Sequence, residues 1–429
     1  MKNALVLAGG GTKGIYQLGV IEAMRELNLD NWDIITGTSV GALNAMFLVQ
    51  NDYERLRYMY EHMTADQFVE GYLPSDFGFV RLLRDREELL PALISWGREK
   101  GVNIEPFYRM VDTYFDPEKF FSSDIDFGCV TATAKGHDPV YVTKDMMRDR
   151  GRDWLVATAS AYPAFPVKEI DGKEYVDGGY FDNLPVDFAL RLGAEHVTAI
   201  DLSHVPHHPS FIKRRNITYI YPHHELFKFL DFDKEKMRKA RKLGYLDGMK
   251  AFGRYEGLHY TFRHFREPRF LDVWLRRLLM LETEIKLANN LNERLYSAQL
   301  VTDRLKEKTQ LPYLEDREYL YAMCDYVMEL CGCDDEKIYD MQDVLRSFRE
   351  QFADAFSEER EEIPSLNVRE LASYVRKNGT KWIVSRITHT LAYPEHAVLP
   401  QSVLLSLYPF ETAAAWFILL AAREYEKNS

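Results

Sequence analysis

The sequence predicts an α/β fold with a mostly parallel central sheet over residues 1–253, followed by an all-helical region over residues 254–429. In the first part, short apolar runs alternate with amphipathic helical runs, an order that implies parallel strands joined by right-handed crossovers. After Tyr255, long charged amphipathic runs follow one another and strand-like runs almost disappear. With 429 residues, of which 46% are hydrophobic, the chain exceeds one average domain and can bury a large core.

The expected elements of the first part begin with a buried strand at residues 4–7, which ends in glycines. A helix over residues 12–27 follows, because Ile15, Leu18 and Ile21 fall on or near one face. A second strand at residues 34–36 and a second helix at residues 40–49 repeat the unit. Further strands are expected at residues 127–133, 140–143, 174–176, 196–200 and 217–221.

Residues 53–114 are expected to be helical and irregular, and they are rich in Leu, Tyr, Phe and Met. Such a segment could form a lid or a wall for an acyl chain near an active site, or it could only pack its own helices. Residues 412–422 are largely apolar but span about half of a bilayer core at helical rise, so a buried helix is expected there. In the second part, helices are expected at residues 271–297, 315–330, 343–356, 368–377 and 412–426.

Charge and cysteine content narrow the class of protein. The net charge is −12, from 66 acidic and 54 basic residues, which gives no general attraction for nucleic acid. Four cysteines in this length do not make a disulfide framework and are expected to be free thiols in a reducing cytoplasm. The short apolar run at residues 1–8 lacks the length of a signal peptide, so a cytoplasmic protein is expected.

The first glycine-rich motif runs from Gly9 to Gly14 and satisfies G-x-G-x-x-G between a strand and a helix. This is the setting of a dinucleotide-binding fingerprint, which also expects an acid at the end of the second strand to bind the ribose. Here the acid, Asp33, precedes the second strand instead. The alternative is an oxyanion hole, in which the N–H groups of Gly9, Gly10 and Gly11 converge on one point. Lys13 could add positive charge there, or it could be a solvated lysine.

The second motif, Gly37-Thr38-Ser39-Val40-Gly41, fits the G-x-S-x-G nucleophile elbow. The serine of such an elbow sits on a sharp turn between a strand and a helix, so the residues two positions away must be small. The expected strand at residues 34–36 and helix at residues 40–49 provide this context. We therefore interpret Ser39 as a nucleophile.

A nucleophilic serine needs a base. None of the twelve histidines has an evident catalytic context, and the pairs His207-His208 and His223-His224 are interpreted as surface residues in proline-containing loops. Asp177 is the better candidate, because the strand-like run at residues 174–176 delivers it to Gly178 and Gly179. An acid at the end of a strand can lie close to the elbow at the carboxyl edge of the sheet.

These three motifs, in this order and spacing, resemble the patatin-like phospholipase family. The blocks "ATASAYPAFP" at residues 157–166 and "DGGYFDNLPV" at residues 177–186 are similar to further segments of that family. The similarity covers roughly the first 200 to 250 residues. The helical second part resembles the C-terminal extension of some bacterial patatin-like proteins.

The resemblance implies a three-layer α/β/α domain and a Ser39–Asp177 dyad without histidine. Gly10 and Gly11 would supply most of the oxyanion hole, and Lys13 stands where the family usually has arginine. The implied activity is hydrolysis of carboxylic esters in acyl lipids through an acyl-enzyme, with no metal or cofactor. The implied contacts are an acyl lipid and, transiently, a membrane surface; no oligomeric state is predicted.

Two other functions remain open from the sequence. One is a nucleotide-binding α/β protein that uses residues 9–14. The other is a non-catalytic binding or regulatory protein whose helical part docks a partner. The substrate of a hydrolase also stays open among phospholipids, lysophospholipids, neutral glycerides and small soluble esters.

Overall fold

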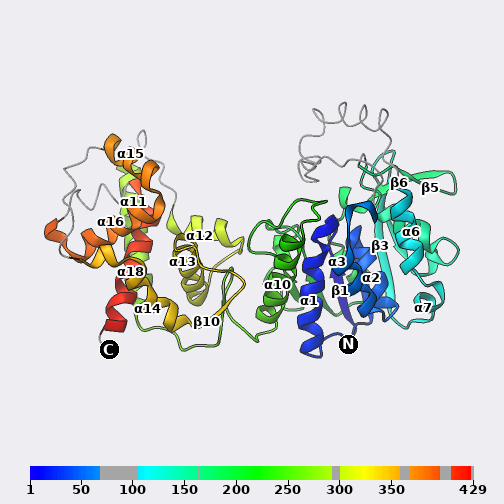
Figure 1. The fold of residues 1–429 in the computed structure, drawn as a ribbon, viewed down its shortest axis with the longest axis horizontal. Coiled ribbons are helices and arrows are strands. Elements are labelled where there is room, and N and C mark those ends of the chain that lie inside the picture. Colours follow the sequence, from blue (N-terminus) through cyan, green and yellow to red (C-terminus); the bar gives the residue numbers. More distant parts are fainter. Residues whose placement is uncertain (68–103, 163, 292–299, 358–367, 397–406, 427–429) are drawn as a thin grey trace. The chain divides into compact units, whose positions relative to one another are not determined.

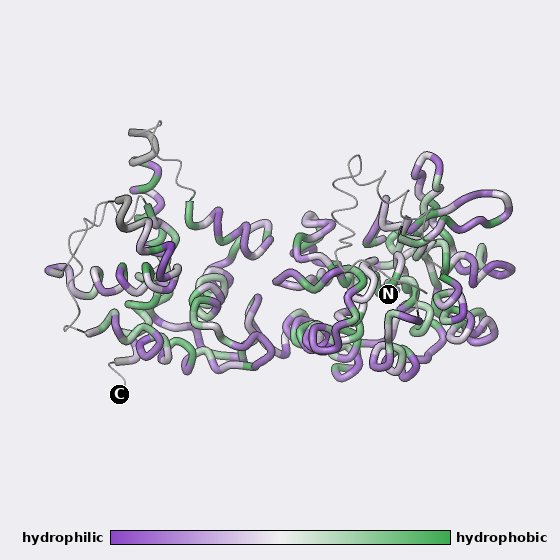
Figure 2. Tube along the Cα trace, turned by 45° about the horizontal axis from the view of Figure 1, so that its top comes forward, coloured by the Kyte–Doolittle hydropathy of each residue, from purple (hydrophilic) through white to green (hydrophobic). Residues whose placement is uncertain are grey.

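The computed structural model describes residues 1–67, 104–162, 164–291, 300–357, 368–396 and 407–426. The chain divides into two compact units, Met1–Gly253 and Arg254–Ser429 (Figure 1). In the N-terminal unit, hydrophobic residues gather on the inner elements and hydrophilic residues on the outer ones (Figure 2). Each unit therefore has its own core.

The N-terminal unit is built on an eight-stranded sheet in which β1, β2, β3, β7 and β8 pair in parallel. The order along the sheet is β5-β6-β3-β2-β1-β7-β8, with β4 also paired to β3. The strands β4, β5 and β6 pair antiparallel. The bounds are β1 (Asn3–Leu7), β2 (Ile34–Thr38), β3 (Asp126–Thr133), β4 (Pro139–Thr143), β5 (Lys168–Ile170), β6 (Lys173–Asp177), β7 (His196–Ile200) and β8 (Ile217–Ile220).

Helices cover both faces of this sheet. Helix α2 packs against β1, β2 and β3, and α9 packs against β1, β2 and β7. In β2, a Cβ atom on Gly37 would point at Gly41 of α2, whereas the hydroxyl of the neighbouring Thr36 donates to the Pro185 carbonyl at the start of α9, so the two helices lie on opposite faces. All ten residues of α2 are buried, which explains why it is apolar on every side. The predicted three-layer α/β/α fold is confirmed. The helices of this unit are α1 (Ile15–Glu26), α2 (Val40–Val49), α3 (Tyr53–His62), α6 (Glu105–Tyr114), α7 (Pro117–Ser122), α8 (Gly151–Thr158), α9 (Val186–Arg191) and α10 (Lys234–Ala251).

The pair α1 and α10 makes the closest helix contact of the N-terminal unit. A Cβ atom on Gly19 would lie 1.9 Å from the carbonyl oxygen of Arg241, and one on Gly244 would lie 2.1 Å from that of Tyr16. The two backbones can touch only because both positions lack a side chain. The hydroxyl of Tyr16 donates to buried Asp247 at 2.6 Å across the same interface. Helix α1, which follows the first glycine motif, is thereby fixed in place.

The C-terminal unit is mainly helical, but not all-helical as predicted, because it also holds two short strands. Helix α18 is its central helix. Helix α18 contacts α11, α12, α13, α14 and α16, and its residues from Ala413 to Ala415 are fully buried. Two short parallel strands, β9 (Thr261–Phe262) and β10 (Ile338–Tyr339), add a small sheet. The helices are α11 (Phe270–Leu291), α12 (Val301–Thr309), α13 (Asp316–Leu330), α14 (Met341–Gln351), α15 (Val368–Asn378), α16 (Thr380–Ala392) and α18 (Pro409–Glu426).

The apolar residues 412–422 lie inside α18, in agreement with the buried helix expected there. Among the residues that the structure describes, no helix combines the length and the apolar character needed to cross a bilayer. The proposed lid or acyl wall at residues 53–114 falls partly outside the described residues, because only its flanking helices α3 and α6 are described. The expected helix at residues 271–297 likewise extends beyond the described end of α11.

We expect Gly244→Ala to lower the free energy of unfolding by about 1–3 kcal/mol, because the new methyl group must push α10 away from α1. Urea unfolding followed by circular dichroism measures this loss. The control is Arg238→Ala on the exposed side of α10, which should change stability by less than about 0.5 kcal/mol. Equal stability of the Gly244 variant and the control would contradict the tight contact.

Candidate active site

Ser39 occupies a sharp turn between β2 and α2. Its φ of 54° lies in the left-handed region, which residues other than glycine seldom adopt. The turn leaves no space for side chains beside it, since a Cβ atom on Gly41 would lie 2.2 Å from the carbonyl oxygen of Leu7. At Gly37 a Cβ atom would lie 2.5 Å from the Gly41 carbonyl carbon. The small residues of G-x-S-x-G therefore have a steric cause in this structure.

Thr158, at the end of α8, holds the strained turn in place. The N–H of Ser39 donates to the Thr158 hydroxyl at 3.0 Å, and that hydroxyl donates in turn to the carbonyl of Val130 in β3. Thr158 is fully buried. Sequence reasoning gave it no role, although it lies in the block at residues 157–166. The role of Thr158 could not be predicted from the sequence, because its hydrogen bond joins two residues that are 119 positions apart.

The register of the sheet brings Asp177 to Ser39. Thr38, the last residue of β2, pairs with Val130 of β3, and Asp177, the last residue of β6, pairs with the adjacent Thr131. Because β4 occupies the other edge of β3 at both positions, β2 and β6 share one edge. Their carboxyl ends therefore meet head to head. From the sequence, Asp177 was expected at the carboxyl end of a strand in a parallel sheet. In the structure β6 runs antiparallel to β3, and the pairing of Asp177 with Thr131 brings the carboxyl group to Ser39.

Burial sets the electrostatics of Asp177. The residue is 1% exposed, and its Oδ1 accepts the N–H of Gly179 at 2.7 Å. Burial raises the pKa of Asp177 to about 7, and the Ser39 hydroxyl and the Gly179 N–H each offset part of that rise. Oδ2 is buried and has no hydrogen-bond partner among the described residues. The carboxyl group is thus a weak acid that changes charge near neutral pH and faces a serine.

The first glycine motif lies at the carboxyl end of β1, beside the elbow. A Cβ atom on Gly9 would lie 3.0 Å from the Cβ atom of Ser39, so the loop and the serine are in contact. The N–H of Gly9 donates to the Asn183 carbonyl at 3.0 Å. Within the described residues, no hydrogen bond uses the N–H of Gly10 or Gly11. Two donors are therefore available next to Ser39, and Gly9 itself is engaged elsewhere.

The remaining motif residues fall close by. Lys13 lies in the 3-10 turn Gly11–Gly14, where burial lowers its pKa while Glu225 and Asp201 partly restore it. The carbonyl of Gly14 accepts from the side-chain amide of Asn44 in α2 at 3.3 Å. Gly178 packs on β3, because a Cβ atom there would lie 2.1 Å from the Val130 carbonyl oxygen.

Asp33, the acid nearest the second strand, lies at the amino-terminal ends of the parallel strands, whereas a residue that binds a ribose would have to lie at their carboxyl ends. Its Oδ2 accepts the N–H of Asn3, at the start of β1, at 2.7 Å. The glycine motif follows the other end of that strand, Leu7. Phe229 also covers the loop, since its carbonyl accepts the Thr12 N–H at 2.9 Å. The arrangement gives the dinucleotide interpretation no support.

A narrow apolar cavity of about 40 Å³ opens beside Ser39. Its wall from α6 is Phe107, which packs against Phe165 with ring centroids 5.5 Å apart. Such a surface can take a hydrocarbon group but offers it no hydrogen bonds. The described residues that line it are Gly11, Thr12, Ser39, Val40, Leu43, Met63, Phe107, Ala159, Phe165, Phe229 and Leu230.

Comparison with known proteins gives matches for the N-terminal part of the chain. Residues 5–190 match the model of the patatin-like phospholipase family. Patatin-like phospholipase domain-containing protein 7 of Mus musculus is 29% identical over 202 residues, which cover 46% of this chain and 13% of that protein. Lysophospholipase nte1 of Aspergillus terreus is 32% identical over 204 residues, covering 47% of this chain and 12% of that protein.

This chain therefore spans only a small part of the length of the curated relatives it matches. Among solved structures, VipD from Legionella pneumophila aligns over 96% of this chain and 91% of that chain. The TM-score is 0.40 and the sequence identity is 13%, values too low to support an inference.

The buried Asp177 should make the protein less stable as pH rises. Its folded pKa of about 7 exceeds the ordinary value of 3.8, so the folded state binds more protons between these values and stability falls across this window. Asp177→Asn removes the charge, and we expect its stability advantage over the natural protein to grow from pH 4 to pH 8. The gain at pH 8 should be about 2–4 kcal/mol.

Urea unfolding at several pH values measures this difference. The control is Asp138→Asn at an exposed loop residue, which should change stability by less than about 0.5 kcal/mol. A stability difference for the Asp177 variant that stays flat from pH 4 to pH 8 would contradict the raised pKa.

Proposed function

We propose that the unit of residues 1–253, in which residues 5–190 match the model of the patatin-like phospholipase family, is a serine hydrolase of carboxylic esters in acyl lipids. Ser39 is the nucleophile and Asp177 is its base. The observation that carries the proposal is the head-to-head meeting of β2 and β6, which sets a strained serine against a buried carboxyl group. No histidine is needed between them.

In the proposed reaction, Asp177 accepts the proton of the Ser39 hydroxyl as Ser39 Oγ attacks the ester carbonyl carbon. The negative charge that forms on the carbonyl oxygen is stabilised by the N–H groups of Gly10 and Gly11 and by the positive end of α2. Collapse of this intermediate expels the alcohol, which takes the proton from Asp177, and leaves an acyl group on Ser39. Asp177 then takes a proton from a water molecule as its oxygen attacks the acyl carbon. When the bond to Ser39 Oγ breaks, Asp177 returns this proton to Oγ, so that the fatty acid leaves and both residues regain their starting state.

The raised pKa suits this role. An aspartate with an ordinary pKa of 3.8 is a poor base, whereas one near 7 accepts a proton more readily and is still ionised above neutral pH. Burial of the Asp177 carboxyl group, which raises its pKa, therefore also makes it a stronger base toward the Ser39 hydroxyl. The carboxyl group obtains this property from its position, because burial is the largest cause of the shift and no charged side chain among the described residues adds to it.

The apolar cavity beside Ser39 favours an acyl chain as the group that enters the site. One relative is a lysophospholipase by name, and from it we extend to this chain only the class of acyl lipid. Substrates of this class lie in membranes or lipid aggregates, so the protein would contact such surfaces transiently. The four cysteines are free thiols, which fits the reducing cytoplasm proposed for it.

We expect Ser39→Ala to lower hydrolysis of p-nitrophenyl butyrate by roughly 10³-fold or more, since no acyl-enzyme can form. The control is Ser122→Ala, a serine at the exposed end of α7, which should keep full activity. A panel of phospholipids, lysophospholipids and glycerides, assayed with the same two variants, then identifies the substrate. Full activity of the Ser39 variant would refute the dyad.

A fluorophosphonate probe tests whether the site is active at all. The probe should label the natural protein and the Ser122 variant but not Ser39→Ala, as read by mass spectrometry of the labelled peptide. Absence of labelling in folded natural protein would favour a non-catalytic binding protein instead.

The rate should depend on pH through Asp177. We expect kcat/KM to rise about tenfold per pH unit below pH 7 and to level off above it, because only the ionised carboxyl group accepts the serine proton. Circular dichroism at each pH checks that the fold is retained. A profile that levels off near pH 4, the ordinary value for aspartate, would show that Asp177 is not the base.

A further inference from the structure

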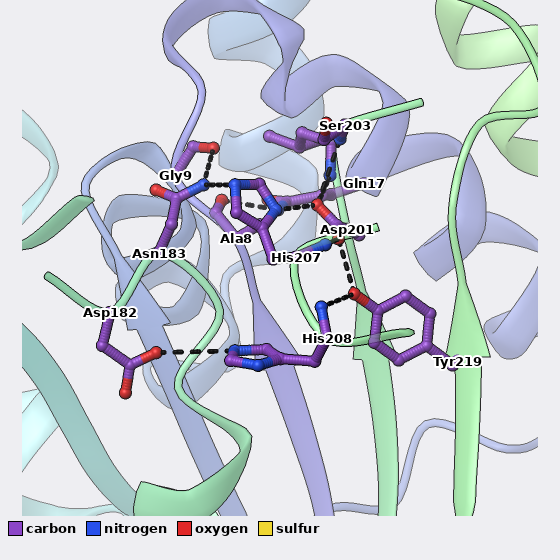
Figure 3. A network of polar contacts seen from close by, with 11 residues as sticks. Ala8, Gly9, Gln17, Asp182, Asn183, Asp201, Ser203, His207, His208 and Tyr219 are labelled. Atoms are coloured by element: carbon purple, nitrogen blue, oxygen red, sulfur yellow. Dashed lines mark hydrogen bonds and ion pairs between the residues drawn. The ribbon is translucent and has the colours of Figure 1, made fainter. Parts of the chain in front are cut away.

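We propose that His207 and Asn183 are positioning residues that hold the glycine loop in the orientation needed to bind the oxyanion. This inference rests on the proposed function, because it concerns the same Gly10 and Gly11 N–H groups. The residues form one chain of hydrogen bonds, from buried Asp201 through His207 and Asn183 to Gly9 (Figure 3). The chain ends on the loop, not on Ser39.

The chain begins at Asp201, the residue after β7, which is fully buried. Burial alone would raise the pKa of this carboxyl group, but hydrogen bonds from His207 and Tyr219 outweigh it and the pKa lies below its ordinary value. Oδ1 accepts His207 Nδ1 at 2.7 Å, and Oδ2 accepts the Tyr219 hydroxyl at 2.6 Å. The backbone N–H groups of Leu202 and Ser203 donate to Oδ1 as well. Asp201 is thus an ionised anchor that can only accept.

An anchor of this kind fixes the state of the His207 ring. Since the Asp201 carboxylate has no proton to give, Nδ1 of His207 must carry the hydrogen of their bond. Nε2 lies 3.2 Å from the amide nitrogen of Asn183, a group that can only donate. In this arrangement Nδ1 of His207 donates to Asp201 and Nε2 faces the Asn183 amide as its acceptor.

Asn183 then holds both sides of one residue of the loop. Its side-chain nitrogen donates to the Gly9 carbonyl at 3.1 Å, and its own carbonyl accepts the Gly9 N–H at 3.0 Å. The Gly9 carbonyl sets this orientation of the amide, because the opposite one would turn Oδ1 toward the Gly9 carbonyl oxygen, and the second contact of the same nitrogen with His207 Nε2 holds the side chain there. Asn183 Oδ1 has no hydrogen-bond partner among the described residues, so no bond to this atom fixes the orientation of the amide.

The effect reaches the oxyanion site through the geometry of the peptide bond. The carbonyl of Gly9 and the N–H of Gly10 belong to one planar trans unit, so they point in opposite directions. Holding the carbonyl at Asn183 therefore fixes the direction of the Gly10 N–H. A bond between two glycines would otherwise rotate easily, because neither residue has a side chain to restrict it. The brace thus prepares a donor before the substrate arrives.

His207→Phe and His207→Gln separate this role from simple packing. Phenylalanine fills the space but makes neither hydrogen bond, whereas glutamine carries a donor for Asp201 and an acceptor for Asn183 at a spacing close to that of the ring. We expect His207→Phe to lower kcat for p-nitrophenyl butyrate roughly 10- to 100-fold, less than the loss from deleting an oxyanion donor outright. KM and the melting temperature should stay near those of the natural protein, and His207→Gln should restore most of kcat.

His208 offers a matched control. Its side chain is 35% exposed, as is that of His207, but it faces Asp182 at 3.9 Å instead of Asn183. His208→Phe should therefore leave kcat unchanged. If His207 acts through Asn183, then Asn183→Ala should lower kcat, and adding His207→Phe to it should lower kcat no further.

Any of the following results would overturn the inference while Ser39→Ala remains inactive: a natural kcat in His207→Phe, a change confined to KM, or equal losses in the Phe and Gln variants with both folded. Additive losses in the double variant would also overturn it. Activity retained by Ser39→Ala would instead refute the proposed function itself. If His207→Phe does not fold, Asn183→Ala and His207→Gln carry the test alone.

Discussion

The arrangement of the site depends on one edge of β3, where β2 arrives from one end and β6 from the other. Thr38 and Asp177 pair with adjacent residues of that edge, Val130 and Thr131. Both strands must therefore end at this point, because neither can extend into the place that the other occupies. The chain after Thr38 has to turn away at once, which puts Ser39 on a tight bend. The proposed nucleophile and base thus lie close together because β2 and β6 both hydrogen-bond to the same edge of β3 and end at adjacent residues of it.

This geometry is unfavourable for both residues taken alone. A serine in the left-handed region costs of order 1–3 kcal/mol, and a buried carboxylate without a cation costs more. The surroundings offset this through the wholly buried helix α2, the Thr158 hydrogen bond and the glycine contact of α1 with α10. Strain and burial at Ser39 and Asp177 are therefore maintained by packing that lies mostly outside the motifs.

Much of the fold could be predicted because its central strands are buried on both faces and appear as plain apolar runs. The strand at residues 196–200 and the helix at residues 40–49 have the predicted bounds. By contrast, β5 (Lys168–Ile170) was missed, because its two leading residues are charged and a short hairpin strand has little apolar pattern. Helix α12 was missed because it is short and lies between the longer helices α11 and α13. Helix α16 was also missed.

The site was predictable only where a motif fixes the local backbone, as at residues 37–41. His207 was interpreted as a surface residue of a proline-containing loop, whereas it bonds a buried aspartate. A signal was present, since Asp201 directly follows a strand just as Asp177 does. Its partner could not be predicted, because hydrogen bonds between separate loops depend on tertiary structure that one sequence does not reveal.

The match to the family ends at residue 190, yet the structure that supports the site continues to Gly253. The later segment contributes two strands of the sheet, the carbonyl of Phe229 that ties the glycine loop, and the helix that locks α1. A fragment that stopped at residue 190 would contain every motif residue but would lack one flank of its own core. In this protein the stretch that is recognisable in sequence is shorter than the stretch that must fold together.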